Sequence, residues 1–263
     1  MFIDHFHMTA LPFCENLPAD RILRDERIAQ GLARLEYLTA AGTLAVITGP
    51  TGVGKSSLVK LFLAGLNRHR YWPLYVHLTH VRPSGLLRLV VMAMGETPIS
   101  GKEQLFWQIL QKARHGEMTP LLVLDEAHLV APEALTDLRL LISSALDDTP
   151  PLKIVLSAQE NLRDQLQRSN HADLVHRISV RYHVPPMSRQ QTAAYIDHHL
   201  TRVGASERIF ENQAKGLIHD YAAGLPRQVN NLATACLINA AARNLPRIDE
   251  PLVNDTLAEF PLA

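Results

Sequence analysis

A glycine-rich turn between two apolar segments constrains the fold of this chain more than any other feature. The turn lies in the segment LAVITGPTGVGKSSLVKLF, residues 44–62. Its residues Gly49, Gly54, Lys55 and Ser56 match the pattern G-x-x-x-x-G-K-[ST]. A short apolar run that is typical of a buried strand precedes the turn, and an amphipathic run that is typical of a helix follows it. The sequence therefore predicts a strand, a phosphate-binding loop and a helix in this order.

The residue types of this loop explain how it binds phosphate. Glycines let backbone N–H groups converge on phosphate oxygens, and the helix N-terminus adds partial positive charge. We expect Lys55 to reach the β- and γ-phosphates of ATP, and the hydroxyl of Ser56 to bind Mg²⁺. The nucleotide-binding residues predicted in the loop are Gly49, Pro50, Thr51, Gly52, Val53, Gly54, Lys55, Ser56 and Ser57.

A second apolar run supplies a pair of carboxylates. It reads PLLVLDEAHLV and brings Asp125 and Glu126 to the end of a predicted strand, where ligands bind in an open α/β sheet. We expect Asp125 to hold Mg²⁺ through water and Glu126 to polarise the water that attacks the γ-phosphate. Together with the loop, this pair predicts an ATP hydrolase with ATP and Mg²⁺ as cofactors, the metal lying at Ser56 and Asp125.

Composition limits the class of protein. The chain has 263 residues, of which 47% are hydrophobic, enough for one α/β core and a small second domain. Its formal net charge is +0, so a contact with nucleic acid has to come from a local patch. The two cysteines are far apart and show no metal-binding spacing. We find no signal peptide and no apolar run of the roughly 20 residues that span a bilayer, and expect a cytoplasmic protein.

The order of apolar and periodic segments predicts two domains. Five short apolar runs alternate with helical periods, which indicates a parallel sheet flanked by helices. The runs are LAVIT, WPLYVHL, PLLVLD, LKIVLS and VRYHV. From Met187 onward only helical patterns follow. We therefore expect an α/β nucleotide-binding domain with an N-terminal extension at 1–186 and a helical lid at 187–263.

Several polar residues near the predicted strands are further candidates for the site. Ser157 and Gln159 follow an apolar run, and either one is a candidate to sense the γ-phosphate or orient the attacking water. Arg177 and Arg181 lie at the edge of a predicted strand, and Arg227 lies at a helix start in the lid. Isolated arginines are usually solvated. Their positions alone therefore assign them no role.

The order of these motifs resembles that of an AAA+ ATPase. The phosphate loop is followed by LDEAH, LSAQENL, HRISVRYHV and, in the helical part, GLPRQVNNL. The flanking segments HFHMTALPF, LRDERIAQGLARLEYLTAAG and GLPRQVNNLATACLINAA resemble most closely the family of the secretion ATPase ExeA and the related transposition helper ATPases (TniB/TnsC-like). Only these flanking segments point to the subfamily, because all AAA+ proteins share the central motifs.

The resemblance implies an assembly and further site residues. It implies a ring or helical homo-oligomer with ATP at the subunit interfaces. It also implies Arg177 as the arginine finger in trans, with Arg181 as the rival, and Arg227 as the lid arginine that touches the γ-phosphate. A rigid guanidinium suits this task because it neutralises charge on the phosphoryl oxygens. The region implied to line the adenine pocket comprises Ile22, Leu23 and Arg24.

Two branches of this family predict different partners. ExeA-type ATPases continue into a membrane segment and a cell-wall-binding portion, whereas this sequence ends at Ala263, soon after its predicted lid. We therefore expect a transposition helper that assembles on duplex DNA with ATP, recruits or activates a transposase, and disassembles upon hydrolysis. A secretion or pilus-assembly ATPase that acts on a protein partner is the alternative. A helicase is disfavoured because it needs a second ATPase-like domain.

A polar loop after the second predicted strand is the candidate DNA contact. Its residues Thr79, His80, Arg82 and Ser84 are suited to follow a phosphate backbone. In similar helpers the corresponding loop faces DNA, and an ordinary solvated loop is the equal alternative. The neutral total charge predicts binding that is salt-sensitive and tolerant of sequence.

Overall fold

The computed structural model describes residues 1–79, 83–144, 152–168 and 171–259. The chain divides into two compact units, which we call the α/β unit and the helical unit. The α/β unit consists of Glu26–Gly49 and Lys55–Val184, and the helical unit consists of Met1–Asp25, Pro50–Gly54 and Pro185–Ala263.

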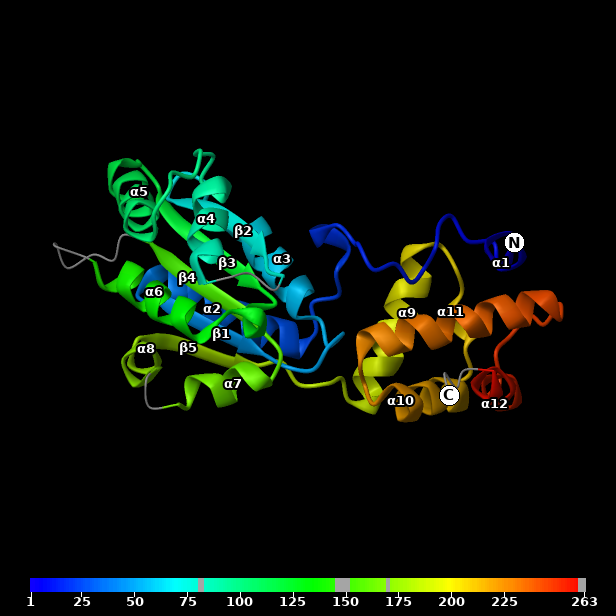
Figure 1. The fold of residues 1–263 in the computed structure, drawn as a ribbon. Helices are drawn as coiled ribbons and strands as arrows, with labels where there is room; N and C mark the ends of the chain where they lie inside the picture. The colour runs from blue at the N-terminus through cyan, green and yellow to red at the C-terminus, as the bar shows by residue number, and fades with distance from the viewer. Residues whose placement is uncertain (80–82, 145–151, 169–170, 260–263) are drawn as a thin grey trace. The chain divides into compact units, whose positions relative to one another are not determined.

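The α/β unit is built on a five-stranded parallel sheet with the order β2-β3-β4-β1-β5 (Figure 1). The strands are β1 Leu44–Thr48, β2 Tyr71–His77, β3 Thr119–Asp125, β4 Lys153–Ala158 and β5 Ile178–His183. The register pairs Thr48 with Ala158 and Asp125 with Ser157, so the carboxyl ends of β1, β3 and β4 meet at one edge. The parallel α/β fold expected from the apolar runs is confirmed.

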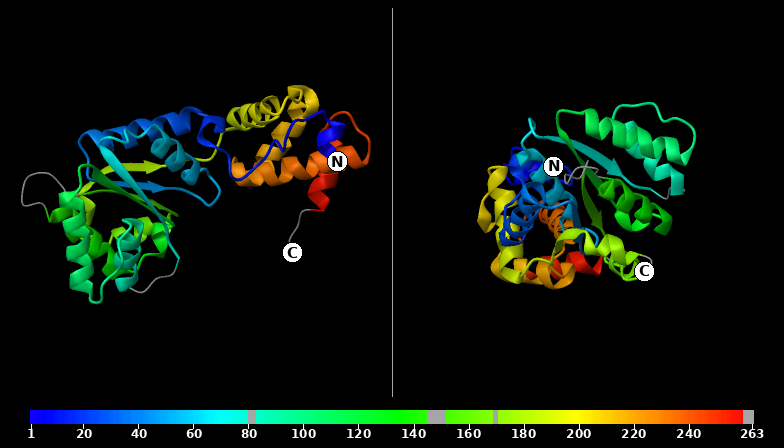
Figure 2. Two further views of the ribbon diagram at one scale, coloured as in Figure 1. Left: turned by 90° about the horizontal axis from the view of Figure 1, so that it is seen from above. Right: turned by 90° about the vertical axis from the view of Figure 1, so that its left-hand side faces the viewer.

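Helices cover both faces of this sheet (Figures 1 and 2). They are α2 Glu26–Ala40, α3 Lys55–Gly65, α4 Pro83–Ala93, α5 Lys102–His115, the short η2 Ala127–Leu129, α6 Pro132–Ser143, α7 Asn161–Leu166 and α8 Ala172–His176. Leu44 and Val46 of β1 share one apolar core with residues of α4 to α8. On α2, a Cβ added at Gly31 would lie 2.6 Å from Cδ2 of Leu58 on α3. This close approach shows how tightly α2 and α3 pack together.

Among the described residues, the helical unit contains four α-helices after Met187, where the sequence predicts only helical patterns. They are α9 Arg189–Arg202, α10 Asn212–Ala222, α11 Pro226–Ala242 and α12 Glu250–Ala258, with the short turn η4 Glu207–Ile209 before α10. Helix α9 begins with a capping box, in which Ser188 accepts from the backbone N–H of Gln191 and the Gln191 side chain accepts from the backbone N–H of Ser188. Buried apolar side chains from α9 to α12 form one core.

The N-terminal segment lies in the helical unit, which differs from the domain 1–186 that we expected from the sequence. It contains α1 Phe2–His5 and the short turn η1 Ala19–Arg21. Phe2, Phe6 and Phe13 are buried in the same core as the lid helices. The backbone N–H of Thr9 donates to the carbonyl of Val203 over 2.9 Å. Burial of three aromatic rings therefore explains where this segment packs.

Among the described residues, no helix has both the length and the apolar character that crossing a bilayer requires.

The two cysteines, Cys14 and Cys236, are free thiols, and burial raises the pKa of Cys236 to about 11. Cys236 therefore stays protonated at neutral pH and packs as a small apolar residue.

Gly224 provides a test of the lid packing. Its φ is 71°, and an added Cβ would lie 2.1 Å from the carbonyl oxygen of Met187. Gly224→Ala should therefore cost about 2 kcal/mol or more and lower the thermal midpoint by roughly 5 °C, as measured by circular dichroism. Gly65→Ala is the matched control, because, among the described residues outside its own helix backbone and chain neighbours, nothing lies within 4 Å of its added Cβ. Equal midpoints for the two variants would contradict this packing.

Candidate active site

The phosphate loop has the backbone conformation that the motif predicts. Gly52 and Gly54 have φ values of 78° and 106°, which residues other than glycine rarely adopt. Helix α3 begins at Lys55, so its N-terminal N–H groups follow the loop directly. Within the loop Thr51 is exposed and Val53 is buried. The loop therefore presents backbone donors to an anion.

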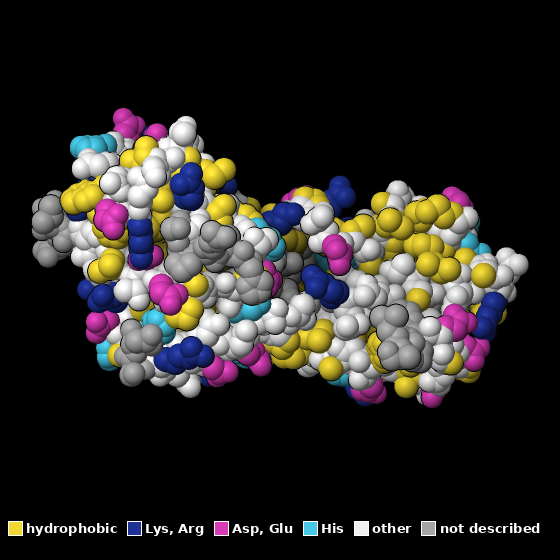
Figure 3. Space-filling model, viewed as in Figure 1, with side chains coloured by type: hydrophobic (Ala, Val, Ile, Leu, Met, Phe, Trp, Pro, Cys, Tyr) yellow, Lys and Arg dark blue, Asp and Glu magenta, His cyan; other side chains and the backbone are white. Residues whose placement is uncertain are grey.

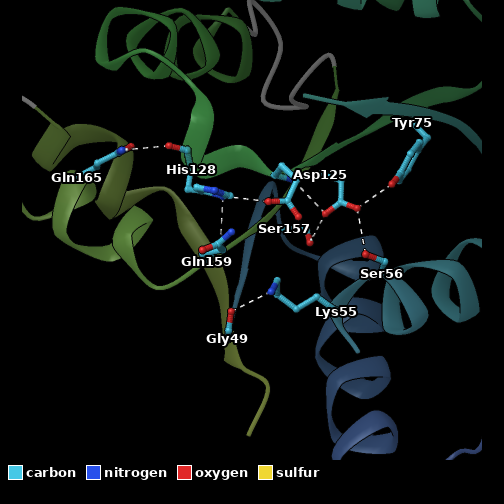
Figure 4. A network of polar contacts seen from close by, with 10 residues as sticks. Gly49, Lys55, Ser56, Tyr75, Asp125, His128, Ser157, Gln159 and Gln165 are labelled. Atoms are coloured by element: carbon cyan, nitrogen blue, oxygen red, sulfur yellow. Dashed lines mark hydrogen bonds and ion pairs between the residues drawn. The ribbon is translucent and has the colours of Figure 1, made fainter. Parts of the chain in front are cut away.

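Lys55 is held against the first residue of the loop. Its side chain is buried, and its Nζ donates to the carbonyl oxygen of Gly49 over 2.9 Å (Figure 4). Burial of an ammonium group is costly unless negative charge lies nearby. The phosphates of a bound nucleotide would add negative charge at this position.

Asp125 is the centre of a polar network at the end of β3 (Figure 4). Its carboxylate is almost fully buried, and both of its oxygens accept hydrogen bonds. Oδ1 accepts from the hydroxyl of Ser157 over 2.7 Å and from the backbone N–H of Glu126 over 3.0 Å. Oδ2 accepts from the hydroxyls of Tyr75 over 2.7 Å and Ser56 over 3.2 Å. Four donors therefore fix the position of this buried charge.

The residues at this position fit a magnesium ion. Ser56 Oγ and Asp125 Oδ2 lie 3.2 Å apart, and both are the hard oxygen donors that Mg²⁺ prefers. The described residues hold no group of three or more His, Cys, Asp or Glu side chains suited to a metal. Mg²⁺ keeps several waters and takes further ligands from phosphate, so one hydroxyl and one carboxylate are enough protein ligands for it.

Tyr75 is a site residue that the sequence analysis missed. Its ring lies on β2, and its hydroxyl reaches Asp125 on the neighbouring strand β3. Burial, the hydrogen bond to Asp125 and the negative charges of Asp125 and Glu126 all raise the pKa of Tyr75. The phenol therefore stays protonated and keeps donating to Asp125. Only knowledge that β2 and β3 are neighbours could have revealed this contact.

Glu126 occupies a different environment from Asp125. Its backbone is left-handed, with φ 57° and ψ 36°, a conformation that is uncommon for residues other than glycine. Its side chain is 32% exposed, and Oε2 lies 3.4 Å from Nδ1 of the buried His128. A carboxylate that is in part open to solvent can reach a water molecule, as a general base must.

Ser157 and Gln159 do not occupy equivalent positions. Ser157 is fully buried, and its hydroxyl hydrogen is directed to Asp125. Gln159 is half-buried, and its backbone N–H lies 3.5 Å from Nδ1 of His128. Ser157 thus supports the carboxylate of Asp125, whereas Gln159 contacts the network through its backbone N–H.

The three arginines named by the resemblance have different surroundings. In the α/β unit, Arg177 is exposed between α8 and β5. Arg181 is exposed on β5, but its Nη2 donates to the carbonyl of Val175 over 2.9 Å. In the helical unit, the backbone N–H of Arg227 donates to the carbonyl of the loop residue Gly52 over 3.3 Å. The side chain of Arg227 also pairs with Glu15 at 3.7 Å.

The remaining candidates lie outside the network. Ile22 and Leu23 are half-buried and Arg24 is exposed, just after η1. In the candidate DNA loop, Thr79 is exposed and Ser84 belongs to the first turn of α4. His80 and Arg82 lie outside the described residues.

Ser157→Ala tests the support of Asp125. The substitution removes a buried donor to a carboxylate, a type of hydrogen bond worth about 1.5–3 kcal/mol, and should lower kcat for ATP hydrolysis roughly tenfold while raising the Mg²⁺ concentration that is needed. Ser143→Ala is the control, since its hydroxyl donates to the carbonyl of Arg139 in its own helix. An unchanged rate and Mg²⁺ requirement in Ser157→Ala would remove Ser157 from this role.

Comparison with known proteins agrees with this geometry. Residues 39–166 match the family model described as AAA domain. General secretion pathway protein A of Aeromonas hydrophila is 29% identical over 260 residues, covering 94% of this chain and 46% of that protein. The chain therefore spans less than half the length of this relative. The comparison supports the AAA part of the expected resemblance and its secretion branch, while membership of the transposition-helper branch stays a prediction.

Solved structures of several organisms share the fold. Cdc6p of Pyrobaculum aerophilum superposes with a TM-score of 0.75 at 15% identity, covering 96% of this chain and 72% of that chain. The ORC1 protein of Aeropyrum pernix, solved in complex with DNA, gives 0.67 at 18% identity and covers 90% and 66%. The RuvB Holliday junction branch migration motor of Thermotoga maritima gives 0.63 at 15% identity and covers 97% and 74%. The phosphate loop with its carboxylate pair and the match of residues 39–166 to the AAA domain together identify this chain as an ATP hydrolase.

Proposed function

We propose that this protein is an ATP-dependent switch that assembles into homo-oligomers on duplex DNA with ATP bound and disassembles after hydrolysis. The observation that carries the hydrolysis step of this proposal is the unequal pair of carboxylates beside the phosphate loop. Asp125 is buried and fixed by four donors, whereas Glu126 is 32% exposed. One carboxylate is thus suited to hold a metal and the other to act on water.

Each residue of the site has a defined task in this proposal. Lys55 and the N–H groups of the loop bind the phosphates of ATP. Ser56 and Asp125 would hold Mg²⁺, which neutralises charge on the phosphate oxygens when it is bound. Glu126 accepts a proton from the attacking water. Gln159 is the better candidate for the γ-phosphate sensor, because the hydroxyl of Ser157 already donates to Asp125.

Two arginines complete the proposed site, one from a neighbouring subunit and one from the lid. We assign the finger in trans to Arg177, because its side chain is exposed. The guanidinium of the rival Arg181 already donates to the backbone carbonyl of Val175 in the same subunit. Arg227 serves as the lid arginine, since its backbone bonds to Gly52 of the loop. An adenine pocket at Ile22 and Leu23 belongs to the same proposal.

The DNA and transposase partners rest on the sequence resemblance to transposition helpers. Aeropyrum pernix ORC1 and Drosophila ORC were solved with DNA, but their likeness to this chain is one of fold. On the face shown in Figure 3, Lys and Arg side chains are interspersed with Asp and Glu side chains. With a formal net charge of +0, binding would depend on a local contact such as the loop after β2 and would weaken with salt.

A secretion role is the second candidate, and one specific observation favours it. The relative from Aeromonas hydrophila, a general secretion pathway protein, matches 94% of this chain. Under this candidate the same ATP cycle would act on a protein partner. The point at which the sequence ends does not discriminate between the roles, because this chain matches only 46% of the length of that relative.

Glu126→Gln tests the proposed function. The variant should bind ATP but hydrolyse it at least about a hundredfold more slowly, because it lacks the general base. With ATP, it should retain duplex DNA on a filter at low salt and release it as salt rises. Lys55→Ala, which should not bind ATP, is the control and should retain no DNA. A Glu126→Gln protein that holds ATP but never retains DNA would contradict the DNA role and leave the secretion role.

Mixed oligomers test the finger assigned to Arg177. Arg177→Ala and Glu126→Gln should each bind ATP and each turn over slowly. Mixed in equal amounts they should recover about a quarter of the wild-type rate, because one variant supplies the intact site and the other the intact finger. Arg68→Ala, at another exposed arginine of the α/β unit, should keep its full rate alone. The assignment would be contradicted if the mixture of Arg177→Ala and Glu126→Gln stayed as slow as either variant alone. It would also be contradicted if Arg181→Ala were slow alone and gained activity when mixed with Glu126→Gln.

A further inference from the structure

The α/β unit contains a cavity of about 620 Å³ beside β5, the last strand in the order of the sheet. Thr48 and Val46 of β1 and Tyr182 of β5 line it from the sheet, and residues from α7 and α8 line it from the helices. Its described lining includes neither the phosphate loop nor Asp125 and Glu126. Its size falls within the roughly 300–1,000 Å³ typical of small-molecule sites.

The charged residues that line this cavity are positive. Arg163 and Arg168 approach from α7 and the turn after it, and Arg181 approaches from β5. Histidines 176 and 183 also line it, and its described lining includes no Asp or Glu. The hydrogen bond from Arg181 to the carbonyl of Val175 fixes one guanidinium in place.

Two carboxylates lie near the cavity, one beside its histidine His183 and the other paired outside it. Glu160 Oε1 lies 3.7 Å from Nε2 of His183, and Asp173 accepts from Nη1 of Arg139 over 3.0 Å. Asp173 is therefore already paired with an arginine outside the cavity. The cluster of three arginines keeps a positive charge that an anion can meet.

Apolar side chains form the rest of the wall. Val46, Leu166, Val175 and Ile178 line the cavity together with the arginines. An apolar floor favours an apolar body in the occupant, and convergent guanidinium groups favour a carboxylate or phosphate. A purely inorganic anion would leave the apolar wall unused, and a neutral ligand would leave the arginines unpaired.

We propose that this cavity is a binding site for a small organic anion, a ligand with an apolar body and a carboxylate or phosphate head group. The body lies against Val46, Val175 and Ile178, and the head group lies among Arg163, Arg168 and Arg181. This site goes beyond the proposed ATP cycle and does not depend on it. Thr48 in its wall precedes Gly49 of the phosphate loop directly, so a test has to keep the nucleotide site filled.

The probe for the test is anilinonaphthalene sulfonate, an aromatic body with one negative group whose fluorescence reports binding. The full chain is first saturated with Mg²⁺ and a non-hydrolysable ATP analogue. We expect one saturable site from which benzoate or phenyl phosphate displaces the probe, and the stronger competitor identifies the head group. The double variant Arg163→Ala, Arg168→Ala should bind the sulfonate at least about tenfold more weakly. Its affinity for the neutral phenylnaphthylamine should be unchanged.

Two further variants serve as controls. Arg208→Ala, at an exposed arginine of the helical unit, should bind the sulfonate as the wild type does. Ala172→Trp adds bulk at the cavity wall without changing charge and should weaken binding of both probes. Three results would each overturn the proposal. The first is full sulfonate affinity in the double arginine variant, and the second is unchanged binding of both probes in Ala172→Trp. The third is a failure of both competitors to displace the sulfonate.

Discussion

The burial of one negative charge, the carboxylate of Asp125, is the interaction on which the rest of the site depends. An unpaired carboxylate in the protein interior costs several kcal/mol, so donors have to converge on it. They come from β2, α3, β4 and the backbone of Glu126. The order β2-β3-β4 of the sheet brings these elements to one edge. Sheet topology and the chemistry of the site are therefore linked by a single side chain.

The two adjacent acidic residues differ in burial because β3 ends between them. Asp125 is the last residue of β3 and remains in register with Ser157 of β4. Glu126 leaves the strand through a left-handed turn and places its side chain partly in solvent. Neighbouring positions thus have different environments, one buried and fixed by hydrogen bonds, the other partly exposed to solvent. The positive cavity beside β5 adds a different type of site to the same sheet.

Much of this arrangement could be predicted from the sequence because its signals are local. The phosphate loop, Lys55 and Asp125 follow from spacing within short segments, and the parallel sheet follows from five apolar runs. Tyr75 could not be predicted, since its contact with Asp125 depends on which strands are neighbours. The packing of residues 1–25 against the lid was equally hidden, because Phe2 and Phe6 share a core with Met187 and with residues of the helices that follow it. Ser157 was found as a candidate, but its hydrogen-bond partner depends on the register of β3 and β4.

In the proposed cycle, Arg177 of one subunit completes the site of the next, so an isolated subunit holds an incomplete site. The most direct measurement is the rate of ATP hydrolysis per subunit over a wide range of protein concentration, with Mg²⁺ and ATP in excess. A site shared between subunits predicts a rate per subunit that is low in dilute protein, rises with concentration and then levels off. A rate per subunit that is the same at every concentration would contradict the shared site.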